Sequence, residues 1–239
     1  SAFIQLSWNA LERYKITNDQ FLLTSMYYFP GLHEAKLIIN DSIVKTQPVY
    51  IEHDDWLTAF RYKPDDVVPI YIETDKVYQD GFIQASTTLL TEYRADTSKE
   101  EYYVSYIRSR DFGVSGDNFS FTTRIKNPAT KGKFHCQTSS IYIYTEAGGI
   151  YLIFSKPGCV GNSRIIVNDK LIDGRRNDLS ALGCDFSQWQ DIRVAVKNKH
   201  FELFINDSLV LETQYEEEMG KILTWQYFFM GNGAVDNLV

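Results

Sequence analysis

The chain has 239 residues, with 24 Lys and Arg against 31 Asp and Glu, for a net charge of −7. Hydrophobic residues make up 44% and charged residues 23%, which is ordinary for a globular protein and excludes a wholly disordered chain. An acidic balance without a basic run argues against nucleic acid and against docking on anionic lipid, and no stretch approaches the roughly 20 apolar residues of a membrane helix. The length fits one large domain or two modest ones.

Both ends of the chain are predicted to lie in β-structure. Residues 1–8 have a strand pattern, with neither the basic region nor the cleavage site of a signal peptide, and the chain stops at Leu238-Val239. We therefore expect the sequence to be a segment of a larger protein. Any signal or membrane anchor would then lie in the missing part.

One local pattern occurs twice. Residues 37–44 read Leu-Ile-Ile-Asn-Asp-Ser-Ile-Val, and residues 203–210 read Leu-Phe-Ile-Asn-Asp-Ser-Leu-Val. Asn and Asp tolerate the left-handed backbone conformation that a tight hairpin needs. We interpret the pattern as one hairpin solution used twice, because the flanking residues do not align.

A domain boundary is expected within 55–77, where prolines interrupt strand pairing because they cannot donate to a ladder. Residues 1–54 would form a first unit that is too small to bury a sandwich core alone. The range 55–77 would be a linker or interface segment, in which Trp56 is expected to hold the units together. Residues 78–239 would form the second unit.

Short alternating strands dominate the second unit, and the fold class is predicted to be all-β. The chain is rich in Tyr (16) and Phe (15). In the range 118–126, Phe119, Phe121 and Ile125 share one face, because successive side chains of a strand point to opposite faces. Arg124 lies on the other face.

Two hairpins are predicted further along the chain. Ranges 140–145 and 149–154 are joined by a turn with two glycines, and ranges 191–196 and 201–205 by a short polar link. Helical signal is weak, with a single turn expected at 178–182.

Residues 27–40 read Tyr-Tyr-Phe-Pro-Gly-Leu-His-Glu-Ala-Lys-Leu-Ile-Ile-Asn, a tyrosine and then Pro-Gly before an alternating strand. This segment resembles the second half of a PKD-type immunoglobulin-like domain. Trp8-Asn9 resembles the start of that family's Trp-Asp motif, although no Phe-Gly-Asp-Gly follows it. The resemblance covers about residues 3–52 and implies a partial immunoglobulin-like sandwich.

A second resemblance covers about residues 78–239. Residues 117–125 are similar to an early strand of concanavalin A-like, laminin-G-like jelly rolls. Residues 186–207 are similar to the core of these jelly rolls, in which a Trp is followed by a strand, a hairpin and a second strand. Residues 231–239 are similar to their closing strand. The pairing of the two modules resembles surface or periplasmic proteins of bacteria. It implies an extracytoplasmic location, a membrane contact only through an anchor outside this chain, and modules that bind or space rather than catalyse.

Known catalytic motifs are missing from the sequence. Some jelly rolls of this class cleave glycans with a Glu-x-Asp-x-x-Glu strand, but Leu57 stands where the second Glu belongs after Glu52-His53-Asp54. No Gly-x-Ser-x-Gly nucleophile turn occurs. We predict a non-catalytic module. A carbohydrate-active enzyme on the same fold is the first alternative, and a structural spacer is the second.

Calcium is the one cofactor that the second resemblance implies, because laminin-G-like jelly rolls sometimes hold this hard cation with oxygen ligands. Its candidate ligands are Asp117, Asn118 and Asp236. The alternative is that these are ordinary turn and strand-end residues, and that no cofactor is needed.

The three cysteines are Cys136, Cys159 and Cys184, and none forms the close pair that structural zinc requires. Cys159 and Cys184 both follow a glycine in an expected loop, and one interpretation is a disulfide between them. The other is three small buried hydrophobic residues, as free cysteines often are.

A binding surface is the preferred functional interpretation. If the apolar residues of the predicted strands face the core, the opposite face carries Arg124, Tyr142, Tyr144 and Tyr151. Tyrosines stack on sugar rings or fill protein interfaces, so the predicted ligand is a glycan or an envelope protein. The alternative is that a second layer covers this face, or that these tyrosines are isolated on the surface.

Overall fold

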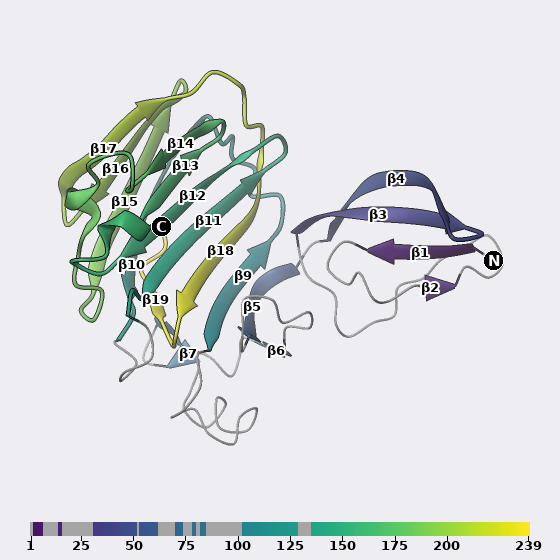
Figure 1. The fold of residues 1–239 in the computed structure, drawn as a ribbon, viewed down its shortest axis with the longest axis horizontal. Coiled ribbons are helices and arrows are strands. Elements are labelled where there is room, and N and C mark those ends of the chain that lie inside the picture. The colour runs from purple at the N-terminus through teal and green to yellow at the C-terminus, as the bar shows by residue number, and fades with distance from the viewer. Residues whose placement is uncertain are drawn as a thin grey trace.

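The computed structural model describes residues 2–6, 14–15, 31–51, 53–61, 70–73, 78–79, 82–84, 102–128 and 135–239. Within these ranges the strands form three antiparallel sheets, of which the two larger ones pack as a sandwich (Figure 1). Helix is confined, in the same ranges, to the short 3-10 turns η2 (Val160–Asn162) and η3 (Ser180–Leu182). No described helix has the length and apolar character to cross a membrane. The prediction of an all-β, jelly-roll-like sandwich is confirmed.

The first sandwich layer, the seven-stranded sheet, has the order β17-β16-β15-β10-β19-β8-β7 in the described residues. Its strands are β17 (Ser208–Gln214), β16 (His200–Ile205), β15 (Gln190–Lys197), β10 (Asn118–Lys126), β19 (Ala234–Asp236), β8 (Phe82–Gln84) and β7 (Tyr78–Gln79). The predicted hairpin of residues 191–205 is β15–β16, so this prediction is confirmed.

The second layer, the eight-stranded sheet, has the order β14-β13-β12-β11-β18-β9-β5-β6 in the described residues. Its strands are β14 (Lys170–Asp173), β13 (Arg164–Val167), β12 (Gly149–Ser155), β11 (Thr138–Thr145), β18 (Ile222–Met230), β9 (Tyr103–Ser109), β5 (His53–Arg61) and β6 (Ile70–Glu73). The predicted hairpin of residues 140–154 is β11–β12.

The core lies between the two layers and follows the period-two alternation of the strands. On β10, Phe121 and Ile125 are 4% and 0% exposed, and on β11 both Ile141 and Ile143 are fully buried, as their positions in the sequence predict. Burying one such side chain contributes roughly 1.5–3 kcal/mol. Because inward residues alternate with outward ones, each layer also has an outer face that does not contribute to this core.

The repeated sequence pattern folds as the same turn in both places. Asn40 and Asp41 have φ angles of 49° and 62°, and Asn206 and Asp207 have the same two values. These positive angles are those of a type I′ turn, whose twist matches that of the flanking strands. The strand pairing also shifts by one residue at the equivalent step of both hairpins. The prediction of one hairpin solution used twice is confirmed.

The third sheet belongs to the predicted first unit and has the order β2-β1-β3-β4 in the described residues. Its strands are β2 (Tyr14–Lys15), β1 (Ala2–Leu6), β3 (Gly31–Ile39) and β4 (Ser42–Ile51). Figure 1 shows this sheet beside the sandwich rather than within it. The resemblance of this unit to a PKD-type domain stays a prediction.

The range 55–77, expected to be a linker, contains most of β5 and all of β6. Strand β5 pairs with β9 on one side and with β6 on the other, so it belongs to the eight-stranded sheet. Trp56 is only 5% exposed, and its ring centroid lies 5.7 Å from that of the buried Tyr227. The sandwich therefore begins at β5 rather than at residue 78.

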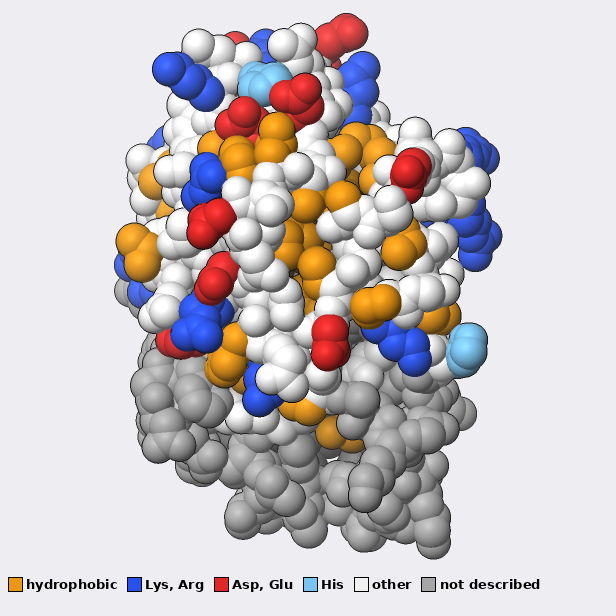
Figure 2. All heavy atoms as spheres, turned by 90° about the vertical axis from the view of Figure 1, so that its left-hand side faces the viewer, with side chains coloured by type: hydrophobic (Ala, Val, Ile, Leu, Met, Phe, Trp, Pro, Cys, Tyr) orange, Lys and Arg blue, Asp and Glu red, His pale blue; other side chains and the backbone are white. Residues whose placement is uncertain are grey.

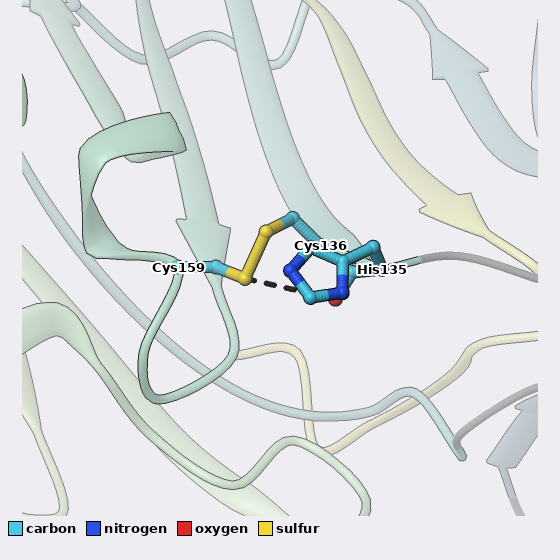
Figure 3. Close-up of a disulfide and its surroundings, with 3 residues drawn as sticks. All are labelled: His135, Cys136 and Cys159. Atoms are coloured by element: carbon cyan, nitrogen blue, oxygen red, sulfur yellow. Dashed lines mark hydrogen bonds between the residues drawn. A yellow bond between two sulfur atoms is a disulfide. The ribbon is translucent and has the colours of Figure 1, made fainter.

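The disulfide of the structure joins Cys136 to Cys159, so the predicted pair of Cys159 and Cys184 is wrong (Figure 3). The register of the β11–β12 hairpin explains the pairing, because Thr138 lies opposite Ser155. Cys136 precedes β11 and Cys159 follows β12, so both lie at the open end of this hairpin. Their Cα atoms are 5.6 Å apart, a distance that a disulfide spans.

Cys184 is a free cysteine that packs against the core and is half-buried. Burial raises the pKa of its thiol, which disfavours the thiolate form. The interpretation as a small buried hydrophobic residue therefore suits Cys184, whereas the other two cysteines close a hairpin.

Candidate functional site

The predicted ligand residues divide between the two outer faces of the sandwich. Tyr142 and Tyr144 on β11 and Tyr151 on β12 lie on the outer face of the eight-stranded sheet, and the structure brings these three together. Arg124 lies on β10, on the outer face of the seven-stranded sheet. The structure therefore does not bring Arg124 together with the tyrosines, and each face is a separate candidate surface.

The outer face of the eight-stranded sheet carries a row of rings from β12, β11, β18 and β9, which we call the aromatic band. Its members are Tyr151, Tyr144, Tyr142, Phe228 and Tyr103. Ring centroids are 5.3 Å apart for Tyr151 and Tyr144, 5.7 Å for Tyr151 and Tyr142, 6.3 Å for Tyr142 and Phe228, and 5.5 Å for Phe228 and Tyr103. These separations fall in the range in which aromatic pairs stabilise one another.

A hydroxyl group of the aromatic band forms a hydrogen bond within its own sheet. Tyr144 Oη donates to Oε1 of Gln226 at 3.3 Å, and Gln226 Nε2 donates to Oγ of Ser105 at 3.2 Å. Burial raises the pKa of Tyr151 above its ordinary value. The three tyrosines are half-buried, so this face is a packed layer of rings rather than a set of projecting side chains.

The outer face of the seven-stranded sheet is organised by Arg124. Strand register places Asp191 of β15 on one side of it and Asp236 of β19 on the other. Its Nε lies 3.2 Å from Oδ1 of Asp191 and its Nη1 3.6 Å from Oδ2 of Asp236. The Arg124 guanidinium carbon also lies 5.2 Å from the ring centroid of Trp189. Two carboxylates and an indole thus fix its orientation.

Arg193 lies next to Arg124 on the same face and is held by an aromatic ring. The pairing of β15 with β16 places it directly opposite Phe204, and its guanidinium carbon is 3.5 Å from the centre of that ring. Within the described residues no carboxylate forms an ion pair with Arg193. The stacked guanidinium therefore keeps donor groups in its plane for another acceptor.

Between these side chains the sheet surface is hollowed, and we call this cavity of about 220 Å³ the arginine hollow. Its lining residues are Thr122, Thr123, Arg124, Asp191, Ile192, Arg193, Asp207 and Asn237. The backbone of Val239 pairs with that of Thr122 through two hydrogen bonds of 3.0 Å, and Asn237 bends the chain with a φ of 50°. Asn237 is thereby held at the edge of β10, where it lines the hollow.

Charges in the arginine hollow balance, because its lining holds two arginines and two aspartates. Guanidinium groups only donate hydrogen bonds and carboxylates only accept them, while the Thr122 hydroxyl and the Asn237 amide do both. An arrangement of alternating donors and acceptors fits a neutral ligand rich in hydroxyl groups better than a polyanion or a polycation.

One of the three predicted calcium ligands, Asp236, lies far from the other two, which are consecutive residues. Asp117 is 8% exposed, and its carboxylate accepts hydrogen bonds from Tyr215 Oη at 2.8 Å and from the Met219 backbone N–H at 3.1 Å. Oδ1 of Asn118 accepts from the backbone N–H of Asn198. Asp236 lies opposite Arg124, about 20 Å further along β10 at roughly 3.3 Å per residue. The structure does not gather these residues into one site.

Sequence reasoning named Arg124 but missed Arg193 and Phe204. The predicted hairpin contains the signal that finds them. Pairing 191–196 with 201–205 across a four-residue link places position 193 opposite position 204, both on the outward face. An arginine opposite a phenylalanine on an exposed face indicates a stacked cation.

The chain matches no family model, and it matches no curated protein. Among solved structures, it is similar to a glycoside hydrolase family 16 endo-glucanase from Bacteroides ovatus over 80% of this chain and 97% of that one, at 9% identity and a TM-score of 0.44. The Emp47p carbohydrate recognition domain aligns with 77% of this chain and 89% of its own, at 12% identity and a TM-score of 0.41. The carbohydrate-binding module CBM66 from Bacillus subtilis aligns with 60% of this chain and 86% of its own, at 9% identity and a TM-score of 0.39.

Proposed function

We propose that the protein is a non-catalytic binding module that holds a neutral glycan in the arginine hollow. The observation that supports this is the lining of the hollow. Arg193 is stacked on Phe204 and has no ion pair in the described part of the chain. The exposed Asp191 and Asn237 line the same hollow. Each hydroxyl of a sugar ring both donates and accepts. A rigid set of donors and acceptors therefore fits neighbouring hydroxyl groups.

Aromatic rings at the hollow support the same ligand class. Phe204 lies beneath Arg193, and Trp189 lies beside Arg124, so the apolar face of a sugar would meet a surface of rings and guanidinium planes. The backbone beneath is a sheet strand rather than a mobile loop, which lowers the entropy lost on binding. An envelope protein is the competing partner, and it would engage a wider surface than the hollow.

Binding without turnover is part of this proposal. A retaining glycosidase places two carboxyl groups about 5 Å apart, flanking the bond that breaks. Glu202 and Glu212 have oxygens within 4.8 Å of each other, but both carboxylates lie within 4 Å of His200 Nε2, and neither residue lines the hollow in which the glycan is proposed to bind. This arrangement favours binding over glycan hydrolysis.

The test is an array of neutral oligosaccharides followed by calorimetric titration of the strongest hit. We expect Arg193→Ala and Asp191→Ala each to weaken binding at least tenfold, because each removes a hydrogen-bonding group from the hollow. Arg175→Ala removes an exposed arginine outside the hollow and serves as the matched control. Unchanged affinity in both hollow variants would overturn the proposal, and release of reducing ends during incubation would replace it with hydrolysis.

We further propose an extracytoplasmic location, supported by the disulfide of Cys136 with Cys159. Disulfides form and persist in oxidising compartments and are rare where glutathione keeps thiols reduced. Thiol alkylation of the protein in intact cells, followed by mass spectrometry, tests this. We expect label on Cys184 alone after denaturation, whereas label on all three cysteines would contradict the proposal.

A further inference from the structure

Three metal-ligating side chains converge on the outer face of the seven-stranded sheet, next to the arginine hollow but outside its lining. Nε2 of His200 lies 3.8 Å from Oε1 of Glu202 and 3.9 Å from Oε2 of Glu212. One ligand atom from each of the three residues lies within 4.8 Å of the other two. Figure 2 views the side of the molecule where β15 to β17 lie and shows histidine and acidic side chains gathered at one end of this face.

Strand geometry places the three residues together. His200 and Glu202 are two residues apart on β16, so their side chains leave the same face of the sheet. Glu212 on β17 is the direct cross-strand partner of Glu202. Two ligands from one strand and a third from its neighbour form a triangle on a rigid surface, without any contribution from a loop.

The two carboxylates of this triangle carry more negative charge than the one histidine can neutralise. Glu202 and Glu212 stand opposite each other, an arrangement of like charges that destabilises a sheet. Among the described residues, the ion pairs of both carboxylates are with His200, and neither pairs with a Lys or Arg. On β15, Ala195 is the partner of Glu202 and leaves room beside it, while Lys197 is the partner of His200 and is exposed.

We propose that His200, Glu202 and Glu212 bind a divalent first-row transition metal, with Zn²⁺ as the representative ion. One imidazole and two carboxylates suit zinc, whereas Ca²⁺ and Mg²⁺ prefer oxygen ligands throughout. At bond lengths of about 2.0–2.2 Å, tetrahedral ligand atoms are about 3.4 Å apart. The separations in the structure are slightly larger, so small side-chain rotations close the triangle around an ion.

Three protein ligands leave a fourth position of a zinc ion open. Glu202 is two residues from Phe204 along β16, a distance of roughly 7 Å at 3.3–3.4 Å per residue. A metal at this site would therefore stand beside the arginine hollow, with its open position on the same face. The metal site is independent of the proposed glycan function, because its ligands do not line the hollow.

The experiment is a calorimetric titration of the chelator-treated chain with ZnCl₂, in a Cys184→Ser background that removes the free thiol as a competing ligand. We expect one Zn²⁺ per chain and at least a tenfold loss of affinity in both His200→Ala and Glu212→Gln. His135→Ala and Glu218→Gln are matched controls, since both remove an exposed side chain of the same type elsewhere. The affinities of these two control variants should be unchanged.

Each other outcome overturns the metal site. Absence of saturable binding removes it, and equal affinity in the parent and the two site variants shows that zinc binds elsewhere. Loss of binding in the control variants as well shows scattered surface binding. Because no sugar is present in this titration, its failure leaves the glycan proposal standing, and failure of the glycan array leaves the zinc result standing. Circular dichroism confirms that each variant is folded.

Discussion

The two outer faces of the sandwich use their side chains in opposite ways. On the eight-stranded sheet, Tyr142, Tyr144 and Tyr151 pack against one another, and the phenol of Tyr144 bonds to its own sheet. On the seven-stranded sheet, Arg193 is stacked on Phe204 and has no ion pair in the described residues.

Under the proposed function, the half-buried rings of the aromatic band and the stacked arginine of the hollow have different roles. A ring surrounded by other rings contributes mainly to stability, whereas a charged group that is fixed in orientation but not neutralised is prepared for a ligand. Substitutions on the aromatic band should therefore lower stability more than binding, and substitutions in the arginine hollow should do the reverse.

The largest effect is expected at the disulfide that closes the hairpin carrying the three tyrosines. Replacing Cys136 and Cys159 by serine should lower the free energy of unfolding by about 3 kcal/mol, the entropy of a closed loop of this length. Guanidinium unfolding followed by tryptophan fluorescence measures the change. Cys184→Ser is the control and should cost much less, and a loss below about 1 kcal/mol in the double variant would contradict the prediction.

The next effect tests a contact that anchors the connection between the two layers. Asp117 precedes β10 of the seven-stranded sheet and holds Tyr215 and Met219 in the segment that leads to β18 of the eight-stranded sheet. Asp117→Ala leaves both donors without their acceptor and should cost about 2–3 kcal/mol of unfolding free energy. Thermal unfolding should show no comparable shift for the exposed Asp111→Ala. Equal shifts of the unfolding temperature in both variants would contradict this role of Asp117.

A smaller effect is expected within the aromatic band. Tyr142→Ala removes ring contacts with Tyr144, Tyr151 and Phe228 and should cost about 1–2 kcal/mol, at 0.5–1.5 kcal/mol per aromatic pair beyond buried area and with partial relaxation. Tyr142→Phe keeps the ring and should be nearly neutral in urea unfolding. If Tyr142→Ala weakens glycan binding as much as Arg193→Ala does, the ligand contacts the aromatic band instead.

The smallest effect on stability is expected in the arginine hollow. Arg193→Ala removes one cation–π contact with Phe204 and should lower the free energy of unfolding by less than about 1 kcal/mol. The same variant is expected to lose most of its glycan affinity. A destabilisation above about 2 kcal/mol would mean that Arg193 is structural, and calorimetric unfolding beside the binding titration separates the two roles.

Local features of the fold were predictable from the sequence. The alternation of Phe121, Ile125, Ile141 and Ile143 identifies inward faces, because a strand has only two sides. The Asn-Asp pairs identify their turns, since few residue types accept two positive φ angles in succession. Both conclusions depend on chemistry within a few residues along the chain.

Features that depend on the arrangement of distant strands were not predictable in the same way. The outward position of Arg124 follows from alternation, but nothing local to it indicates that β10 and β11 belong to different sheets. The same limit explains why the sequence led to the wrong cysteine pair. Cys159 and Cys184 have similar surroundings in sequence, and only the register of β11 against β12 shows that Cys136 lies closer.

The matching Asn-Asp turns bear on how the chain folds. Each closes a hairpin between neighbouring segments, and such a hairpin forms in roughly 1–10 μs, long before pairing across distant segments is complete. One turn lies in the four-stranded sheet and the other in the sandwich. We therefore expect the hairpins at these two turns to form early, each within its own sheet, before the two layers of the sandwich join.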